Sequence, residues 1–182
     1  LVLMAAQQFT TASSVLKVAL ILQSSAVAFA YGGSIFNRIP SLRNKIPAYF
    51  LGEDLTEALT SIDSLLTGSV SLPQNQEAND HRDAAARYQA CRTGIEQAVS
   101  VSMQSAGLSI DQINGMNAFL GERLNAALTF GDPSLIDSDM NWLRGWHSIH
   151  QLPSRFLVSY LAAYIQALDT CILVLQHMPQ LG

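Results

Sequence analysis

The chain has 182 residues, a formal net charge of −4 and a sequence pI near 5.4. This acidic balance, with only 10 Lys and Arg residues, excludes the basic surface that nucleic-acid binding requires. Charged residues make up 13% of the chain, against roughly a quarter in an ordinary soluble domain. We therefore expect much of the surface to be covered by other protein subunits, by lipid or by a second copy of the chain.

The charges are also unevenly distributed along the chain. The first 37 residues carry only Lys17, and the last 27 carry only Asp169. The length suits a single helical domain over residues 1–182. Within it we expect an N-terminal helix or docking arm over residues 1–37 and a mobile loop over residues 68–80.

The N-terminal region predicts a helix from Thr10 to Ala30 that ends at Gly32-Gly33. Residues 17–30 also have the charged start, apolar middle and small-residue end of a secretory signal. We expect an uncleaved helix and favour a cytoplasmic protein, with an exported or organellar location left open. Residues 15–36 are long enough to cross a membrane but contain polar residues and glycines, so we do not favour a span there and leave contact with lipid open as the alternative.

The next region begins with a loop and one helical turn over residues 35–46. An amphipathic helix is then predicted after Gly52, with acidic residues at its start, where the helix dipole favours them. Its apolar residues are spaced for one helix face: Leu55, Leu59, Ile62, Leu65 and Leu66. This helix is expected to end near Gly68, where the loop begins.

Two long helices are predicted after the loop. The first runs from Asp80 to a glycine stop at Gly107, and Ser109 precedes the second. Apolar residues recur in the second helix at intervals of three or four: Ile110, Ile113, Met116, Leu120, Leu124 and Leu128. This spacing predicts that one face of the second helix packs on a core.

Two proline breaks divide the C-terminal region. Asp132-Pro133 and Leu152-Pro153 each predict a helix start, because proline is well suited to the first helical position. The last helix, to about His177, is apolar nearly all round, which predicts burial in a core or an interface. Asp169 within it argues against lipid. The chain as a whole predicts an all-α fold of about six or seven helices, globin-like or an irregular helical bundle.

The residues around these breaks carry a family resemblance. It starts with the segment ERLNAALTFGDPSL at residues 122–135, continues through WLRGW at residues 142–146 and Leu152-Pro153, and ends with YIQAL at residues 164–168. This pattern resembles the last three helices of globin-like modules, which occur in phycobiliproteins and before cobalamin-binding domains of bacterial sensory regulators. The resemblance implies a globin-like bundle that dimerises and binds a linear tetrapyrrole or relays a signal.

The cysteines depart from the phycobiliprotein pattern. In that family a bilin-bearing cysteine is followed closely by Arg-Asp, whereas Cys91 is followed by Arg92-Thr93-Gly94. We therefore do not expect covalent bilin attachment. Cys91 and Cys171 show no paired spacing, so both are predicted to be buried free thiols.

The best candidates for noncovalent binding of a tetrapyrrole, either bilin or heme, are aromatic and histidine residues near the second proline break: Trp142, Trp146, His147, His150 and Tyr160. The spacing of His147 and His150 places them on one helix face. A metal site is not predicted, because two histidines lack the further ligands that structural zinc requires.

The sequence contains no recognisable catalytic motif, so we do not expect an enzyme. We favour a noncatalytic helical subunit that packs into an oligomer or a larger protein complex, through self-association or other subunits. The alternative is a globin-like sensory or pigment-associated module that binds a tetrapyrrole noncovalently.

Overall fold

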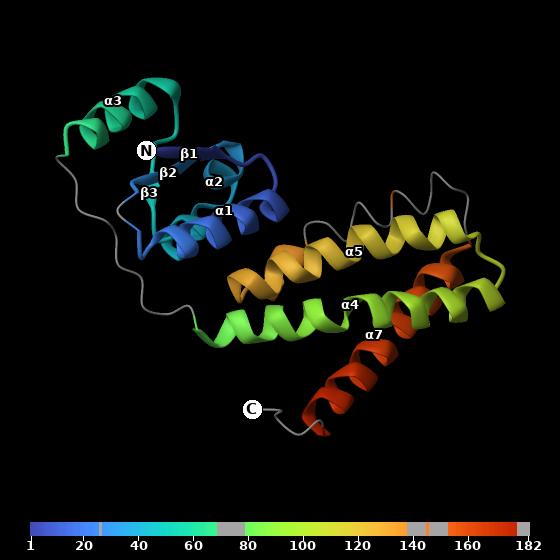
Figure 1. Ribbon diagram of the computed structural model, residues 1–182. Helices are drawn as coiled ribbons and strands as arrows, with labels where there is room; N and C mark the ends of the chain where they lie inside the picture. Colours follow the sequence, from blue (N-terminus) through green and yellow to red (C-terminus); the bar gives the residue numbers. More distant parts are fainter. Residues whose placement is uncertain (26, 69–78, 138–144, 146–152, 178–182) are drawn as a thin grey trace. The chain divides into compact units, whose positions relative to one another are not determined.

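The computed structural model describes residues 1–25, 27–68, 79–137, 145 and 153–177 (Figure 1). The chain is predominantly helical, consistent with the predicted all-α class, and also contains a small three-stranded sheet. It divides into two compact units, whereas the sequence predicts one domain. The α/β unit comprises Leu1–Arg82 with Thr129–Gly131, and the helical unit comprises Asp83–Leu128 with Asp132–Gly182.

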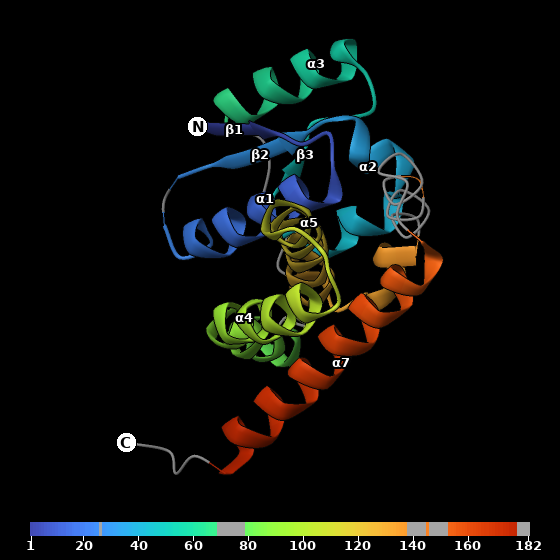
Figure 2. The ribbon, with the colours of Figure 1, turned by 90° about the vertical axis from the view of Figure 1, so that its right-hand side faces the viewer.

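The α/β unit is built on three parallel strands in the order β1-β2-β3. The strands are β1 (Val2–Ala5), β2 (Phe29–Gly32) and β3 (Tyr49–Phe50). Helix α1 (Phe9–Leu22) connects β1 to β2, and α2 (Ser34–Arg38) with the 3₁₀ turn η1 (Pro40–Lys45) connects β2 to β3. Helix α3 (Leu55–Leu66) follows β3. Figures 1 and 2 show α1 and α3 on opposite sides of the strands.

The predicted helix over Thr10–Ala30, and with it the helical arm over residues 1–37, is wrong in its second half. Helix α1 ends at Leu22, and the following apolar residues form β2. Phe29, Ala30 and Tyr31 are all buried. A short strand buried on both faces has no alternating pattern of apolar and polar residues. Its sequence therefore cannot be distinguished from a continuation of the preceding apolar helix.

The helical unit contains α4 (Asn79–Ser105), α5 (Ile110–Phe130), the 3₁₀ turn η2 (Pro133–Ile136) and α7 (Ser154–His177). Helices α4 and α5 run antiparallel, and α7 packs against them (Figures 1 and 2). Their shared core contains these buried residues: Tyr88, Cys91, Ile95, Val99, Met103, Leu108, Ile113, Met116, Leu120, Tyr160 and Tyr164. The predicted apolar face of α5 is therefore confirmed, except that Ile110 is exposed.

The turn between α4 and α5 follows local rules that the sequence shows. Gly107 has a φ of 95°, and the amide of Leu108 donates to the carbonyl of Met103 (3.2 Å), as in a Schellman motif. Ser109 and Gln112 then form a capping box: the Gln112 amide donates to Ser109 Oγ (3.3 Å) and the Ser109 amide to Gln112 Oε1 (3.0 Å). The predicted stop and start are both confirmed.

The two proline breaks are described only in part. Asp132 Oδ1 accepts from the Ser134 amide (3.2 Å), and the turn η2 follows. The helix predicted beyond it lies mostly outside the described residues. Helix α7 begins directly after Pro153, as predicted, and its first bond joins the Phe156 amide to the Pro153 carbonyl (2.9 Å). The predicted mobile loop also lies outside the described residues over 69–78.

Candidate functional site

Most of the predicted tetrapyrrole-binding residues lie outside the described residues: Trp142, Trp146, His147 and His150. Tyr160 is described, and its side chain is fully buried in the core of the helical unit. Its hydroxyl donates to Asn117 Oδ1 (2.9 Å). Tyr160 therefore serves the packing of α7 and offers no surface to a ligand.

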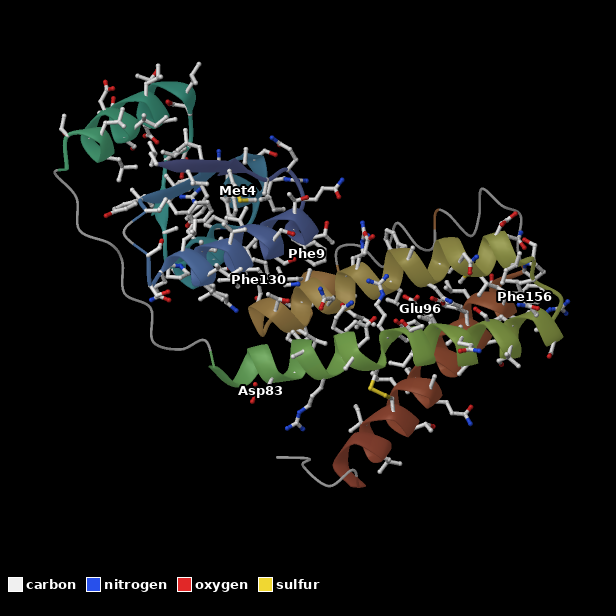
Figure 3. The ribbon with its side chains drawn as sticks, viewed as in Figure 1. Met4, Phe9, Asp83, Glu96, Phe130 and Phe156 are labelled. Atoms are coloured by element: carbon white, nitrogen blue, oxygen red, sulfur yellow. A yellow bond between two sulfur atoms is a disulfide. The ribbon has the colours of Figure 1, made fainter. Side chains whose placement is uncertain are left out.

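Cys91 and Cys171 form a disulfide, so the prediction of two free thiols is wrong (Figure 3). The bond joins α4 to α7 across a Cα–Cα distance of 6.2 Å and a sequence separation of 80 residues. The sequence holds no signal for this pair, because the two positions meet only when α7 packs on α4. The disulfide fixes α7 covalently to α4 within the helical unit.

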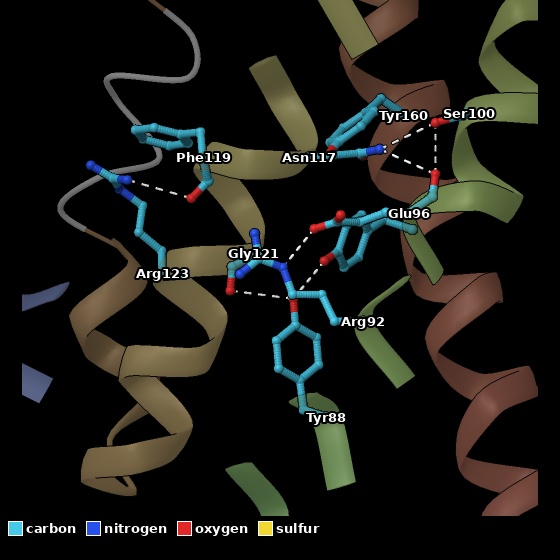
Figure 4. Close-up of polar contacts among 10 residues, drawn as sticks. Tyr88, Arg92, Glu96, Ser100, Asn117, Phe119, Gly121, Arg123 and Tyr160 are labelled. Atoms are coloured by element: carbon cyan, nitrogen blue, oxygen red, sulfur yellow. Dashed lines mark hydrogen bonds and ion pairs between the residues drawn. The ribbon is translucent and has the colours of Figure 1, made fainter. Parts of the chain in front are cut away.

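Polar side chains from three helices meet beside the disulfide and form a polar core, which consists of Tyr88, Arg92, Glu96, Asn117, Tyr160 and Tyr164 (Figure 4). The hydroxyls of Tyr88 and Tyr164 lie 2.6 Å apart, and Tyr88 also donates to the Gly121 carbonyl (3.3 Å). Asn117 joins all three helices, because Nδ2 donates to the Glu96 carbonyl (3.1 Å) on α4 while Oδ1 accepts from Tyr160 on α7.

An ion pair lies at the edge of the polar core. Arg92 Nε donates to Glu96 Oε1 at 2.6 Å, one turn further along α4. Arg92 also lies against α5 at Gly121, where an added Cβ would come within 2.7 Å of Nε. Glycine at position 121 thus allows the guanidinium to approach the α5 backbone closely.

The electrostatics of the polar core favour neutral tyrosines. Burial raises the pKa of Tyr88, Tyr160 and Tyr164 above the ordinary value of 10.0. Because the Tyr88 hydroxyl donates to the Gly121 carbonyl, it accepts from the Tyr164 hydroxyl, and this hydrogen bond raises the pKa of Tyr164 further. No buried side-chain nitrogen or oxygen lacks a hydrogen-bond partner among the described residues. These groups therefore hold the three helices in register and are not poised to transfer protons near neutral pH.

A groove of about 380 Å³ lies between α4 and α7 beside the disulfide. Small residues from both helices line it, including Gly94, Ala98, Ala163 and Ala167. Its few polar groups come from Ser102, Gln166 and Thr170, and Thr170 Oγ1 is already bonded to the Gln166 carbonyl (2.8 Å). The described residues contain no cluster of three or more metal-ligating side chains, here or elsewhere.

The carboxyl ends of the strands in the α/β unit form a second polar region. Gly33 follows β2 with a φ of 117°, and an added Cβ would lie 2.1 Å from the Ala6 carbonyl oxygen. Ser34 Oγ donates to Gln7 Oε1, and Arg38 donates to the Gln7 carbonyl. Open parallel sheets bind ligands at this edge, where the loops after the strands meet.

Rows of large aliphatic residues remain exposed on two helices. The sequence predicts that α3 is amphipathic, with its apolar residues on one face. In the structure Leu55, Leu59 and Leu66 on this helix are exposed, and no residue of α3 is fully buried. On α7, the exposed residues include Val158, Ile165, Ile172 and Leu173. The predicted apolar faces therefore exist, and the residues that the structure describes leave them exposed.

Helix α7 is also the one described helix long and apolar enough to cross a membrane. The window Ser154–Leu173 has a mean hydropathy of 1.6. Residues 15–36, which the sequence marks as a weak candidate, are divided among α1, β2 and α2. Length and composition thus single out α7 as the helix whose outer surface requires an explanation.

Comparison with known proteins provides no family for this chain: no protein-family model and no curated protein matches it. The function must therefore be argued from the geometry of the described residues. Sequence reasoning missed the disulfide and the polar core. The sequence does contain one signal for the latter, since Tyr160 and Tyr164 are four residues apart on an apolar helix and buried tyrosine hydroxyls require partners.

Proposed function

We propose that this chain is a noncatalytic subunit that packs into an oligomer or a larger protein complex. The observation that carries the proposal is the pair of exposed aliphatic rows on α3 and α7. Burial of a Leu, Ile or Val side chain contributes about 1.5–3 kcal/mol, so covering either row with protein is strongly favourable. Exposed rows of this kind on a chain with few charges are typical of a surface that meets a partner.

The use of the polar side chains supports a noncatalytic role. The groups of the polar core are paired with one another, and the tyrosines among them are held neutral by burial. Asn117 and the Tyr88–Tyr164 pair connect helices rather than face an open cavity. The most ordered polar arrangement of the described residues is thus committed to holding the bundle together.

The size of the chain's assembly in its native cell tests the proposal. A tagged chain should elute from native extract at a mass well above that of one chain. Replacing Leu59 and Ile165 together with Gln should shift it to lower mass, because both aliphatic rows are interrupted. Val101→Gln is the matched control, since Val101 is equally exposed but belongs to neither row. Elution at the mass of a single chain would overturn the proposal.

A second candidate is a sensory or pigment-associated module that binds a tetrapyrrole noncovalently. The observation that favours it is the parallel sheet of the α/β unit, with the Gly33 loop at the edge where such sheets bind ligands. The sheet edge supports ligand binding in general, and the resemblance of residues 122–168 to globin-like modules is what suggests a tetrapyrrole as the ligand.

Visible absorption separates the second candidate from the first. Purified chain is mixed in turn with heme, biliverdin and cobalamin, and each spectrum is compared with that of the free ligand. A Soret or bilin band lost in His147→Ala would support binding beside the second proline break, and one lost in Ser34→Lys would support binding at the sheet edge. A colourless protein with unshifted ligand spectra would reject the candidate.

The disulfide bears on the cellular compartment. Disulfides persist in oxidising compartments and are rare in the reducing cytosol. We therefore propose an exported or organellar location instead of the cytoplasmic one that the sequence favours. Alkylation of the protein in intact cells, followed by mass spectrometry, should leave Cys91 and Cys171 unmodified; two alkylated thiols would reject this location.

A further inference from the structure

We propose that α7 pairs antiparallel with α7 of a second copy of this chain and so forms a twofold-symmetric dimer. The inference rests on the proposed function and names its partner. It starts from the outer face of α7, where Val158, Ile165 and Ile172 are 68%, 59% and 44% exposed. These three residues form the outer row.

The outer row has the spacing of a helix-pairing seam. Its members are seven residues apart, so they lie nearly above one another on the helix. Leu161 and Leu168 fall between them and are only half-buried by the helical unit. The resulting alternation of three and four residues is that of the a and d positions of a two-helix seam, with β-branched residues at a and leucines at d.

Two charges decide the direction of pairing. Arg155 and Asp169 are the only charged residues over Ser154–Leu173, both are exposed, and each lies seven residues from Ala162. They therefore occupy the same edge of the seam on either side of a small central residue. No ion pair to either of them is present among the described residues.

Antiparallel pairing centred near Ala162 brings Arg155 of each copy opposite Asp169 of the other, so the ion pair is made twice. Parallel pairing instead places the equivalent edges on opposite flanks of the seam, so that Arg155 and Asp169 do not meet and no ion pair forms between them. Opposite charges on the flanks of a seam select orientation in this way, and a twofold axis repeats every contact. The charge pattern thus selects the antiparallel arrangement.

The inner side of α7 is held in place by the rest of the helical unit. Tyr160 and Tyr164 are bonded into the polar core, and Cys171 is bonded to α4. The outer row is therefore presented on a fixed helix, and little order is lost when it pairs. A helix of this length extends over about 36 Å, so the interface is small and a dimer of modest, micromolar affinity is expected.

A second copy explains the outer row better than a membrane does. Lipid would cover the aliphatic residues, but Asp169 lies beside the row and within the candidate span Ser154–Leu173. Burial of an unpaired carboxylate within a bilayer is unfavourable. In the dimer the same carboxylate gains an arginine partner.

Sedimentation equilibrium of the full chain over a concentration series from micromolar to hundreds of micromolar tests the dimer. Wild-type chain should show reversible dimerisation that Ile165→Gln abolishes and Val101→Gln leaves unchanged. Arg155→Asp and Asp169→Arg should each weaken dimerisation about tenfold, because each of the two symmetry-related ion pairs is replaced by repulsion between like charges. The double variant carrying both changes should recover the wild-type affinity.

Each other outcome overturns the inference in a distinguishable way. Wild-type chain that stays monomeric would reject self-association, while a large complex in native extract would leave the proposed function standing. Failure of the double variant to recover would reject the antiparallel pairing. Flotation of monomeric chain with phosphatidylcholine vesicles would assign the outer row to lipid instead.

Discussion

The two units of this protein are stabilised in different ways. The α/β unit packs short elements around aliphatic and aromatic residues, and Tyr31 is its one fully buried tyrosine among the described residues. The helical unit packs long helices around a mainly apolar core that also contains hydrogen-bonded polar side chains and a disulfide. Long helices with smooth apolar faces can slide or rotate past one another, whereas directional bonds hold a single register. The comparison indicates that the helical unit depends on specific partners and the α/β unit on backbone fit.

Alkaline pH should produce the largest difference in stability between the two units, by destabilising the helical unit more than the α/β unit. The folded pKa values of Tyr88, Tyr160 and Tyr164 lie above the unfolded value of 10.0, so their contribution is complete below pH 10 and falls as pH rises through and beyond it. Each tyrosine can lower the free energy of unfolding by about 1.4 kcal/mol per pH unit in that window. In the α/β unit, burial raises the pKa of Tyr31 to about 12, although the charge of Arg43 opposes this rise. Tyr31 is therefore the one buried tyrosine among the described residues of this unit whose ionisation would destabilise it at high pH.

Hydrogen–deuterium exchange by peptide across pH 9 to 12, corrected for the intrinsic exchange rate, checks this prediction. Peptides from α4, α5 and α7 should lose protection before those from β1 and β2. Simultaneous loss in both units, or earlier loss in the α/β unit, would contradict it.

Removal of the disulfide should destabilise the helical unit selectively. The chain-entropy model assigns about 4.5 kcal/mol to a crosslink that closes a loop of about 80 residues, and measured values are typically about 2–4 kcal/mol. Replacing Cys91 and Cys171 together with Ala should lower the denaturant concentration at which α4 and α7 lose protection, as measured by hydrogen–deuterium exchange of the intact chain. Adding dithiothreitol to the wild-type protein should have the same effect, and no effect on the double variant. An unchanged midpoint would show that the polar core suffices.

A substitution at Gly33 should destabilise the α/β unit rather than the helical unit. Gly33→Ala places a Cβ 2.1 Å from the Ala6 carbonyl in a left-handed conformation, so we expect a loss of about 2–4 kcal/mol from strain and displacement of β1. Gly68→Ala is the control, because its φ is also positive, at 75°, but nothing lies within 4 Å of the added atom. Equal effects of the two variants in chemical denaturation would contradict the close approach of backbone at Gly33.

The smallest expected effect comes from removing one hydroxyl from the polar core. Tyr160→Phe leaves the buried Asn117 Oδ1 without its donor, which should cost about 1–3 kcal/mol. Asn117→Leu should cost less in the Tyr160→Phe chain than in the wild-type chain, since its bond to Tyr160 is then already absent, while the bond from Nδ2 to the Glu96 carbonyl is lost in both chains. Ser159→Ala, at an exposed neighbouring position, should have no measurable effect. Independent, additive losses from the two core variants would show that the bond contributes nothing to stability.

The accuracy of sequence reasoning follows the range of the interactions involved. The starts and stops at Ser109, Gly107 and Pro153 were predictable, because caps and turns depend on residues within a few positions of one another. The strand β2 was not, because its partners β1 and β3 lie far from it in the chain and its own letters are simply apolar. The predicted tetrapyrrole residues stay a prediction, apart from Tyr160, which the fold buries.

By itself, the sequence determined that this protein is mainly helical, where α4, α5 and α7 begin and end, and that large apolar faces lack charged cover. These properties depend on local hydrogen bonding, helix periodicity and composition, all of which can be read along the chain. Only the tertiary structure decided that Cys91 bonds Cys171, that Asn117 and the tyrosines share a polar core, and that the outer row of α7 is left exposed. Those outcomes depend on which helix faces meet, and packing brings together residues such as Cys91 and Cys171, 80 positions apart, that no local pattern connects.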